Sequence, residues 1–169
     1  MNFERPTWEE WLEGLDEERR SRTLTLVERF RTAGCPSPED WVRSEIDEDI
    51  PQLARYVFLR LLWDDRLQPW RTGAAFAELP EARALVDSGT DLAQLLELLI
   101  IVVSDTVWRT LTLLDRAWVH PLVDHPALPG WKLMEVDGGT GEITGRELAA
   151  LHESLREADP QGDEGHPLL

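Results

Sequence analysis

"TDLAQLLELLIIVVSDTVWRTLTLLDRA", residues 90–117, is the longest helical pattern in the chain and decides the fold. On a helical wheel at about 100° per residue, its apolar residues cover a wide face and leave one polar stripe. At about 1.5 Å per residue, such a helix would be roughly 40 Å long. We therefore predict a central helix that is buried on several sides and on which the other helices pack. The polar stripe contains Thr90, Asp91, Gln94, Glu97, Ser104, Asp105, Arg109, Thr112, Asp115 and Arg116.

The rest of the chain repeats helix signals and has few strand signals. Capping residues, first-turn prolines and helix-stopping glycines predict shorter helices that begin near residues 7, 16, 37, 49 and 80, and a final one that begins at Thr144. Two short segments joined by a glycine-rich turn predict a β-hairpin at about residues 131–144. The predicted fold class is all-α, a bundle of roughly six helices around the long central helix, with the small hairpin near the C-terminus. Residues 1–158 would form one domain and residues 159–169 a flexible tail.

The composition is strongly acidic. The 169 residues include 33 Asp and Glu against 17 Lys and Arg, which gives a net charge of -16. Nucleic acids and anionic membrane surfaces bind clustered basic residues, so this charge argues against both as ligands and favours a basic protein partner. The most apolar run, residues 95–103, contains Glu97 and is too short to span a membrane. Cys35 is the only cysteine, which excludes an intramolecular disulfide. We expect a cytoplasmic, bacterial protein.

The stretch "VDGGTGEITGREL", residues 136–148, resembles the calcium loop of an EF-hand. Such a loop needs oxygen ligands at its first, third and fifth positions and a glutamate at its twelfth. With Glu147 at the twelfth position, the other three are a valine, a glycine and a threonine, so the charged ligands are missing. The alternative is a capping box, in which Thr144 caps the final helix and Glu147 bonds back to the Thr144 amide. We therefore predict no calcium site at this stretch, and we predict no metal and no cofactor for the protein as a whole.

Two other groups of residues have some features of metal sites. His120, Asp124 and His125 are residue types that bind zinc, but their spacing in a proline-broken segment matches no zinc motif. Glu45 and Glu48 resemble the Glu-x-x-Glu pair with which all-helical nucleotide pyrophosphohydrolases hold magnesium. The second, Glu-x-x-Asp pair of that family is absent, so the resemblance implies an incomplete metal cluster. No serine or cysteine stands in a nucleophile motif, which argues against an enzyme.

We favour a protein-binding function, in the manner of an immunity protein, an antitoxin or an adaptor. The acidic surface would engage a basic protein partner, and the absence of catalytic motifs leaves binding as the simpler role. The candidate partner-binding residues combine an aromatic side chain with dense negative charge. They are Trp41, Glu45, Asp47, Glu48 and Asp49.

Two alternatives stay open. The first is a helical-bundle enzyme with an acid-lined, metal-dependent pocket for a small molecule or nucleotide, formed by Glu97, Asp105, Arg109 and His120. Convergence of these side chains in a concave site would favour it, and convex exposure would count against it. The second is a structural subunit, because the eight tryptophans could supply an apolar interface for a homo-oligomer.

Overall fold

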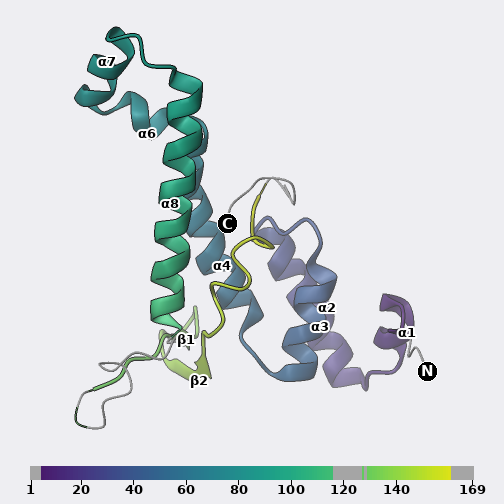
Figure 1. Ribbon diagram of the computed structural model, residues 1–169. Helices are drawn as coiled ribbons and strands as arrows, with labels where there is room; N and C mark the ends of the chain where they lie inside the picture. The colour runs from purple at the N-terminus through teal and green to yellow at the C-terminus, as the bar shows by residue number, and fades with distance from the viewer. Residues whose placement is uncertain (1–4, 116–126, 128, 161–169) are drawn as a thin grey trace.

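The computed structural model describes residues 5–115, 127 and 129–160 (Figure 1). The chain is mostly helical, with a long helix and a small antiparallel hairpin near the C-terminus, so the predicted all-α class is confirmed. The elements are α1 (Trp8–Glu13), α2 (Glu17–Thr32), α3 (Pro38–Glu48), α4 (Gln52–Leu62), the π-helical turn η1 (Trp63–Leu67), α5 (Gln68–Arg71), α6 (Ala74–Ala77), α7 (Pro80–Asp87), α8 (Leu92–Leu114), β1 (Met134–Val136) and β2 (Ile143–Glu147).

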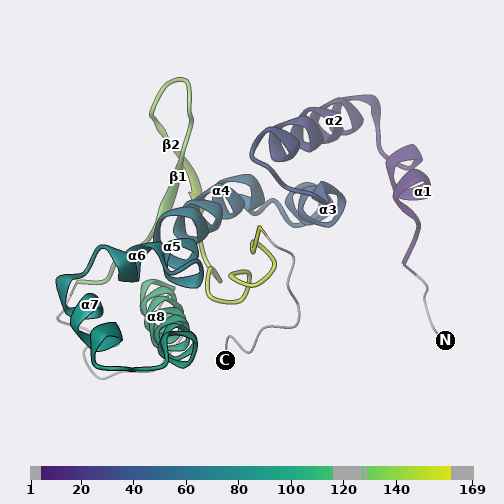
Figure 2. The same ribbon diagram turned by 90° about the horizontal axis from the view of Figure 1, so that it is seen from above.

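The helices are arranged around one continuous column. Helix α2 packs on α3, α3 packs on α4, and α4 continues through η1 into α5. Helix α8 packs against η1 and α5, so it lies alongside this column (Figures 1 and 2). Helices α6 and α7 connect the column to the start of α8, and α1 lies on the opposite side of the molecule. The hairpin lies beside α4.

Local capping signals determine where several helices begin. Thr7 and Glu10 form a complete capping box at the start of α1. Asp16 caps α2 and Asp91 caps α8, each through a carboxylate oxygen that accepts a hydrogen bond from a first-turn amide. These side chains satisfy amides that have no partner within the helix. The three helix starts therefore confirm the predictions made from these residues.

Helix α8 is much less buried than its sequence predicts. Two of its buried residues, Ser104 and Thr112, belong to the predicted polar stripe. Leu98 and Val102 are instead 56% and 52% exposed. The physical reason is that α8 packs against η1 and α5 along one side, and no described element covers the other side. The prediction of burial on several sides is wrong.

An aromatic core lies where α2, α3 and α4 meet. The Tyr56 ring stands edge-on to two others, with its centroid 5.4 Å from that of Trp41 and 5.7 Å from that of Phe30. All three side chains are buried. Full burial of a large apolar side chain contributes about 1.5–3 kcal/mol to folding. The same core cluster continues through Trp63 of η1 to the inner side of α8.

The C-terminal segment, residues 148–160, contains turns in place of the predicted final helix. Its backbone carbonyls accept hydrogen bonds from side chains of other elements. Trp63 Nε1 donates to the carbonyl of Leu155 at 2.7 Å, and Arg55 Nη2 donates to the carbonyl of Ala150 at 2.8 Å. These donors satisfy carbonyl groups that a helix would have bonded internally. The prediction of a final helix is therefore wrong, although the segment still contributes apolar side chains to the core.

The predicted hairpin is confirmed, but its second strand is longer than expected. Glu147 lies in β2 opposite Met134, and its carboxylate accepts a hydrogen bond from Lys132. A capping box between Thr144 and Glu147 is therefore wrong, because both residues belong to a strand. In the turn between the strands, Gly141 has a positive φ of 73°, which is the conformation that favours glycine.

Parts of two predicted segments fall outside the described residues. These are positions 116 and 117 of the long helix and positions 161–169 of the tail. Within the part of the chain that the structure describes, no helix combines the length and the apolar character needed to cross a membrane.

The core makes a prediction about alkaline pH. Burial raises the pKa of Tyr56 to about 12, above the ordinary value of about 10. Between these values the unfolded chain releases the proton and the folded chain retains it, so the free energy of unfolding falls as the pH rises. Tyr56 is the only tyrosine, so ultraviolet absorbance of tyrosinate reports it alone. We expect little tyrosinate at about pH 10 while tryptophan fluorescence still shows the folded state. Half-ionisation of Tyr56 in the folded protein at that pH would contradict its burial in this core.

Candidate functional site

The predicted partner-binding patch at the end of α3 is only partly at the surface. Trp41 is 8% exposed and packs against Phe30 and Tyr56, so it belongs to the core. Glu45 is 2% exposed, and its Oε2 accepts a hydrogen bond from the backbone amide of Leu53 at 2.9 Å. Neither side chain can present itself to a protein partner without unfolding its surroundings.

The other three residues of this patch are exposed. Asp47 lies 3.5 Å from Arg19, and Asp49 lies 3.9 Å from Arg22. Glu48 is exposed as well. Two of the three carboxylates therefore have an arginine nearby, which reduces the negative charge that this end of α3 presents. A partner-binding role for Asp47, Glu48 and Asp49 stays a prediction.

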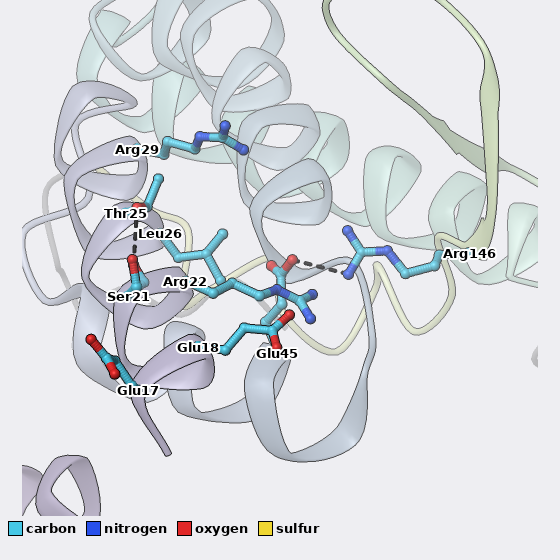
Figure 3. Close-up of a pocket in the computed structure, with 9 residues that line it drawn as sticks. All are labelled: Glu17, Glu18, Ser21, Arg22, Thr25, Leu26, Arg29, Glu45 and Arg146. Carbon is cyan, nitrogen blue, oxygen red and sulfur yellow. Dashed lines mark hydrogen bonds and ion pairs between the residues drawn. The ribbon is translucent and has the colours of Figure 1, made fainter. Parts of the chain in front are cut away.

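A charged cleft of about 800 Å³ lies next to this patch, between α2, α3 and β2 (Figure 3). Its inner wall is a partly buried ion pair, in which Arg146 Nη1 lies 3.0 Å from Glu45 Oε1. Arg146 also donates to Glu135 of β1 at 2.7 Å. Burial alone would lower the pKa of Arg146, but its hydrogen bonds to Glu135 and Glu45 raise it above the ordinary value. Arg146 therefore stays charged and joins the hairpin to α3. The cleft is lined by Glu17, Glu18, Ser21, Arg22, Thr25, Leu26, Arg29, Glu45 and Arg146.

Two of the four residues predicted for an enzyme pocket do meet at a cavity. Asp105 and Arg109 form an ion pair at 2.7 Å on α8, and both line a cavity of about 480 Å³ between α8, η1 and the C-terminal segment. Glu97 is exposed and does not line it, and His120 lies outside the described residues. The cavity is lined by Trp63, Ser104, Asp105, Trp108, Arg109, His152, Glu153, Leu155 and Arg156.

The C-terminal segment brings a histidine to this cavity. His152 Nδ1 lies 2.7 Å from Asp115 Oδ2, and the same oxygen accepts a hydrogen bond from the His152 backbone amide at 3.0 Å. The Asp115 side chain is 2% exposed, and the Trp108 ring stands edge-on to the imidazole at 5.8 Å between centroids. The His152 ring is thus fixed from two sides. Periodicity does not predict this role, because the histidine reaches α8 from a segment without regular structure.

The hydroxyl of Ser104 is buried beside the cavity and makes no hydrogen bond. A serine, a histidine and an aspartate therefore lie close together, but no hydrogen bond joins Ser104 to His152. Nucleophilic catalysis needs the base within hydrogen-bond reach of the hydroxyl, so this arrangement is not an assembled catalytic triad.

The glycine-rich loop of the hairpin uses its acid to fold. Asp137 Oδ1 accepts hydrogen bonds from the amides of Gly139 and Thr140 at 3.0 and 2.8 Å. The backbone hydrogen bond from Thr140 is the main cause that lowers the pKa of Asp137. Among the described residues, no group of three or more His, Cys, Asp and Glu side chains is placed to share a metal ion. The predicted zinc-type residues His120, Asp124 and His125 fall outside those residues.

A third surface, which sequence analysis missed, lies on α7 and α8. On α7 and the N-terminal half of α8, six large apolar side chains are between 40% and 56% exposed. Figure 1 shows that α7 and the N-terminal half of α8 extend away from α1, α2 and α3. Within residues 78–102 there are also five acidic residues and a single cation, Arg83. We call the six side chains the apolar arm; they are Leu85, Val86, Leu92, Leu98, Ile101 and Val102.

Comparison of the chain with protein-family models, with curated proteins and with solved structures gives no match. Function is therefore inferred from the geometry of the end of α3 with its charged cleft, the cavity beside α8, and the apolar arm.

The Arg146–Glu45 pair makes a stability prediction. Arg146→Gln removes the cation from a carboxylate that is 2% exposed, and an uncompensated buried charge costs about 3 kcal/mol. We expect the free energy of unfolding, measured with urea and tryptophan fluorescence, to fall by about that amount. The matched control is Arg31→Gln, which breaks an exposed pair with Glu28 at 2.7 Å and should cost less than about 1 kcal/mol. Equal losses in the two variants would show that the first pair does not join the hairpin to α3.

Proposed function

We propose that this protein is a protein-binding protein of the adaptor, antitoxin or immunity-protein type, and that the apolar arm is the centre of its binding surface. The observation that carries the proposal is the exposure of six large apolar side chains on two consecutive helices. Large exposed apolar patches on folded proteins usually mark interaction sites.

The arrangement on α8 supports a helical docking surface. Leu98, Ile101 and Val102 are spaced three and four residues apart, so they lie side by side on the helix. They are the apolar anchors that an interface places at its centre. Full exposure of these groups to water would be unfavourable, and a partner that covers them gains the corresponding hydrophobic free energy.

The charges around the apolar arm favour a basic partner. Residues 78–102 carry five acids and one arginine, which gives a local charge of -4. The five acids would form the rim of the interface; they are Glu78, Glu81, Asp87, Asp91 and Glu97. The remaining acids, including the exposed Asp47, Glu48 and Asp49, add to a net charge of -16 that attracts a basic protein from a distance.

The same charge argues against a second copy of this chain as the partner. Two copies, each with a net charge of -16 and a local charge of -4 beside the apolar arm, would repel one another. A basic partner removes that repulsion and covers the same apolar side chains. A structural subunit that assembles with itself is therefore the weaker alternative.

The proposal predicts which variant loses its partner. Leu98→Ser with Val102→Ser removes two half-exposed apolar side chains, which should cost about 2 kcal/mol of binding free energy, or roughly thirtyfold in Kd. The partner is first isolated by affinity purification from the native host and identified by mass spectrometry. The Kd of its complex with the unchanged protein and with the variant is then measured by calorimetry. We expect a partner with basic surface whose binding weakens as salt is added, because the acidic rim is screened.

The matched control changes two equally exposed leucines outside the arm. Leu24→Ser on α2 with Leu61→Ser on α4 removes side chains that are 50% and 55% exposed. This variant should keep the affinity of the unchanged protein. Equal affinity of the arm variant and the control would refute the proposed surface. Concentration-dependent dimers in light scattering that the arm variant abolishes would refute a heterologous partner in favour of self-assembly.

A further inference from the structure

We propose that the cavity between α8, η1 and the C-terminal segment is a binding site for a small aromatic carboxylate, a ligand with a flat apolar body and one anionic group. This site is separate from the apolar arm and does not depend on the protein-binding function.

The size and walls of the cavity suit a ligand of this shape. Its volume of about 480 Å³ is in the range of small-molecule sites, roughly 300–1,000 Å³. Trp108 and Leu155 give it apolar walls, and Trp63 lines it as a fully buried ring. Aromatic walls favour a planar ring, which can stack on them or meet them edge-on.

The aromatic walls are held in place before any ligand enters. The Trp63 side chain is fully buried, and its Nε1 donates to the carbonyl of Leu155 at 2.7 Å. The guanidinium of Arg71 lies 4.6 Å from the centroid of the Trp63 ring. Trp108 stands against His152, which Asp115 orients. A preformed site binds more tightly because little freedom is lost on binding.

The unmatched polar groups at the cavity include hydrogen-bond donors. The hydroxyl of Ser104 is buried without a partner, although buried polar groups are normally bonded. Arg109 uses Nε for its bond to Asp105, and within the described residues its two terminal nitrogens have no partner. The Arg109 side chain is 59% exposed, so it can turn to a ligand at low cost.

Arg109 selects an anion rather than a cation. The terminal nitrogens of an arginine form a fork that matches the two oxygens of a carboxylate. The cavity is also lined by two carboxylates, Asp105 and Glu153, which would favour a cation. Asp105 already accepts a hydrogen bond from Arg109, and the Glu153 side chain is 70% exposed to water. His152 Nδ1 lies within hydrogen-bond distance of Asp115. Its Nε2 lies 4.0 Å from Glu153 Oε1, which is beyond hydrogen-bond distance. A carboxylate would thus complete the bonding of Arg109 and give Ser104 an acceptor.

The test uses two probes of nearly the same shape, the anionic naphthalene-2-carboxylate and the neutral naphthalene-2-carboxamide. Calorimetric titration of the full chain should show the carboxylate binding at least about tenfold more tightly than the amide, because only the carboxylate gives Arg109 a charged acceptor. Arg109→Gln should remove this preference. Ser104→Ala should weaken binding of the carboxylate by about fivefold. It should leave the folded protein at least as stable, because it removes a hydroxyl that makes no hydrogen bond.

Arg60→Gln is the matched control, because Arg60 Nε on α4 pairs with Asp64 of η1 at 3.0 Å with the same four-residue spacing. This variant should bind both probes like the unchanged protein. The Leu98→Ser, Val102→Ser variant should also bind them normally, which separates this site from the apolar arm. The proposal is overturned if neither probe binds the folded protein in the millimolar range. It is also overturned if the carboxylate binds the Arg109→Gln variant as tightly as the unchanged protein.

Discussion

The hydrogen bonds that attach the C-terminal segment to α4 and η1 are the constraint on which the rest of the structure depends. This segment, residues 148–160, has no helix to satisfy its own carbonyl groups. Arg55 and Trp63 supply the missing donors from α4 and η1, and both are buried. Burial lowers the pKa of Arg55, so its charge is held at a cost that its hydrogen bonds must offset. Without these bonds the inner side of α4 would lose the apolar side chains that cover it.

The position of this segment also explains why α8 has two different sides. The segment brings His152 to Asp115 at the end of α8, and it forms one wall of the cavity with Leu155. The inner side of α8 therefore meets η1 and the C-terminal segment, and Ser104 is buried there although its hydroxyl makes no hydrogen bond. The opposite side has no described neighbour and keeps its leucines and valines exposed. One arrangement thus creates both a cavity on the inner side of α8 and an outward apolar surface.

Structure that depends on residues within one helical turn could be predicted from the sequence, whereas structure that depends on residues far apart in the chain could not. A threonine followed three residues later by a glutamate stands at two of the predicted helix starts. At Thr7 and Glu10 it forms a true capping box. At Thr144 and Glu147 the same pattern lies in a strand, because Glu147 pairs with Met134 and β2 joins β1. Local propensity is a weak prior, and tertiary contacts override it.

The candidate sites follow the same division. The Asp105–Arg109 pair could be predicted, because residues four apart on a helix are neighbours. The burial of Glu45 could not, since its partner Arg146 is 101 residues away in sequence and reaches it only after the hairpin has formed. A run of acids in a sequence therefore does not identify an acidic surface. An acidic binding surface needs carboxylates that no distant arginine neutralises and that lie beside exposed apolar side chains. Carboxylates beside exposed apolar side chains occur on α7 and α8 rather than on α3.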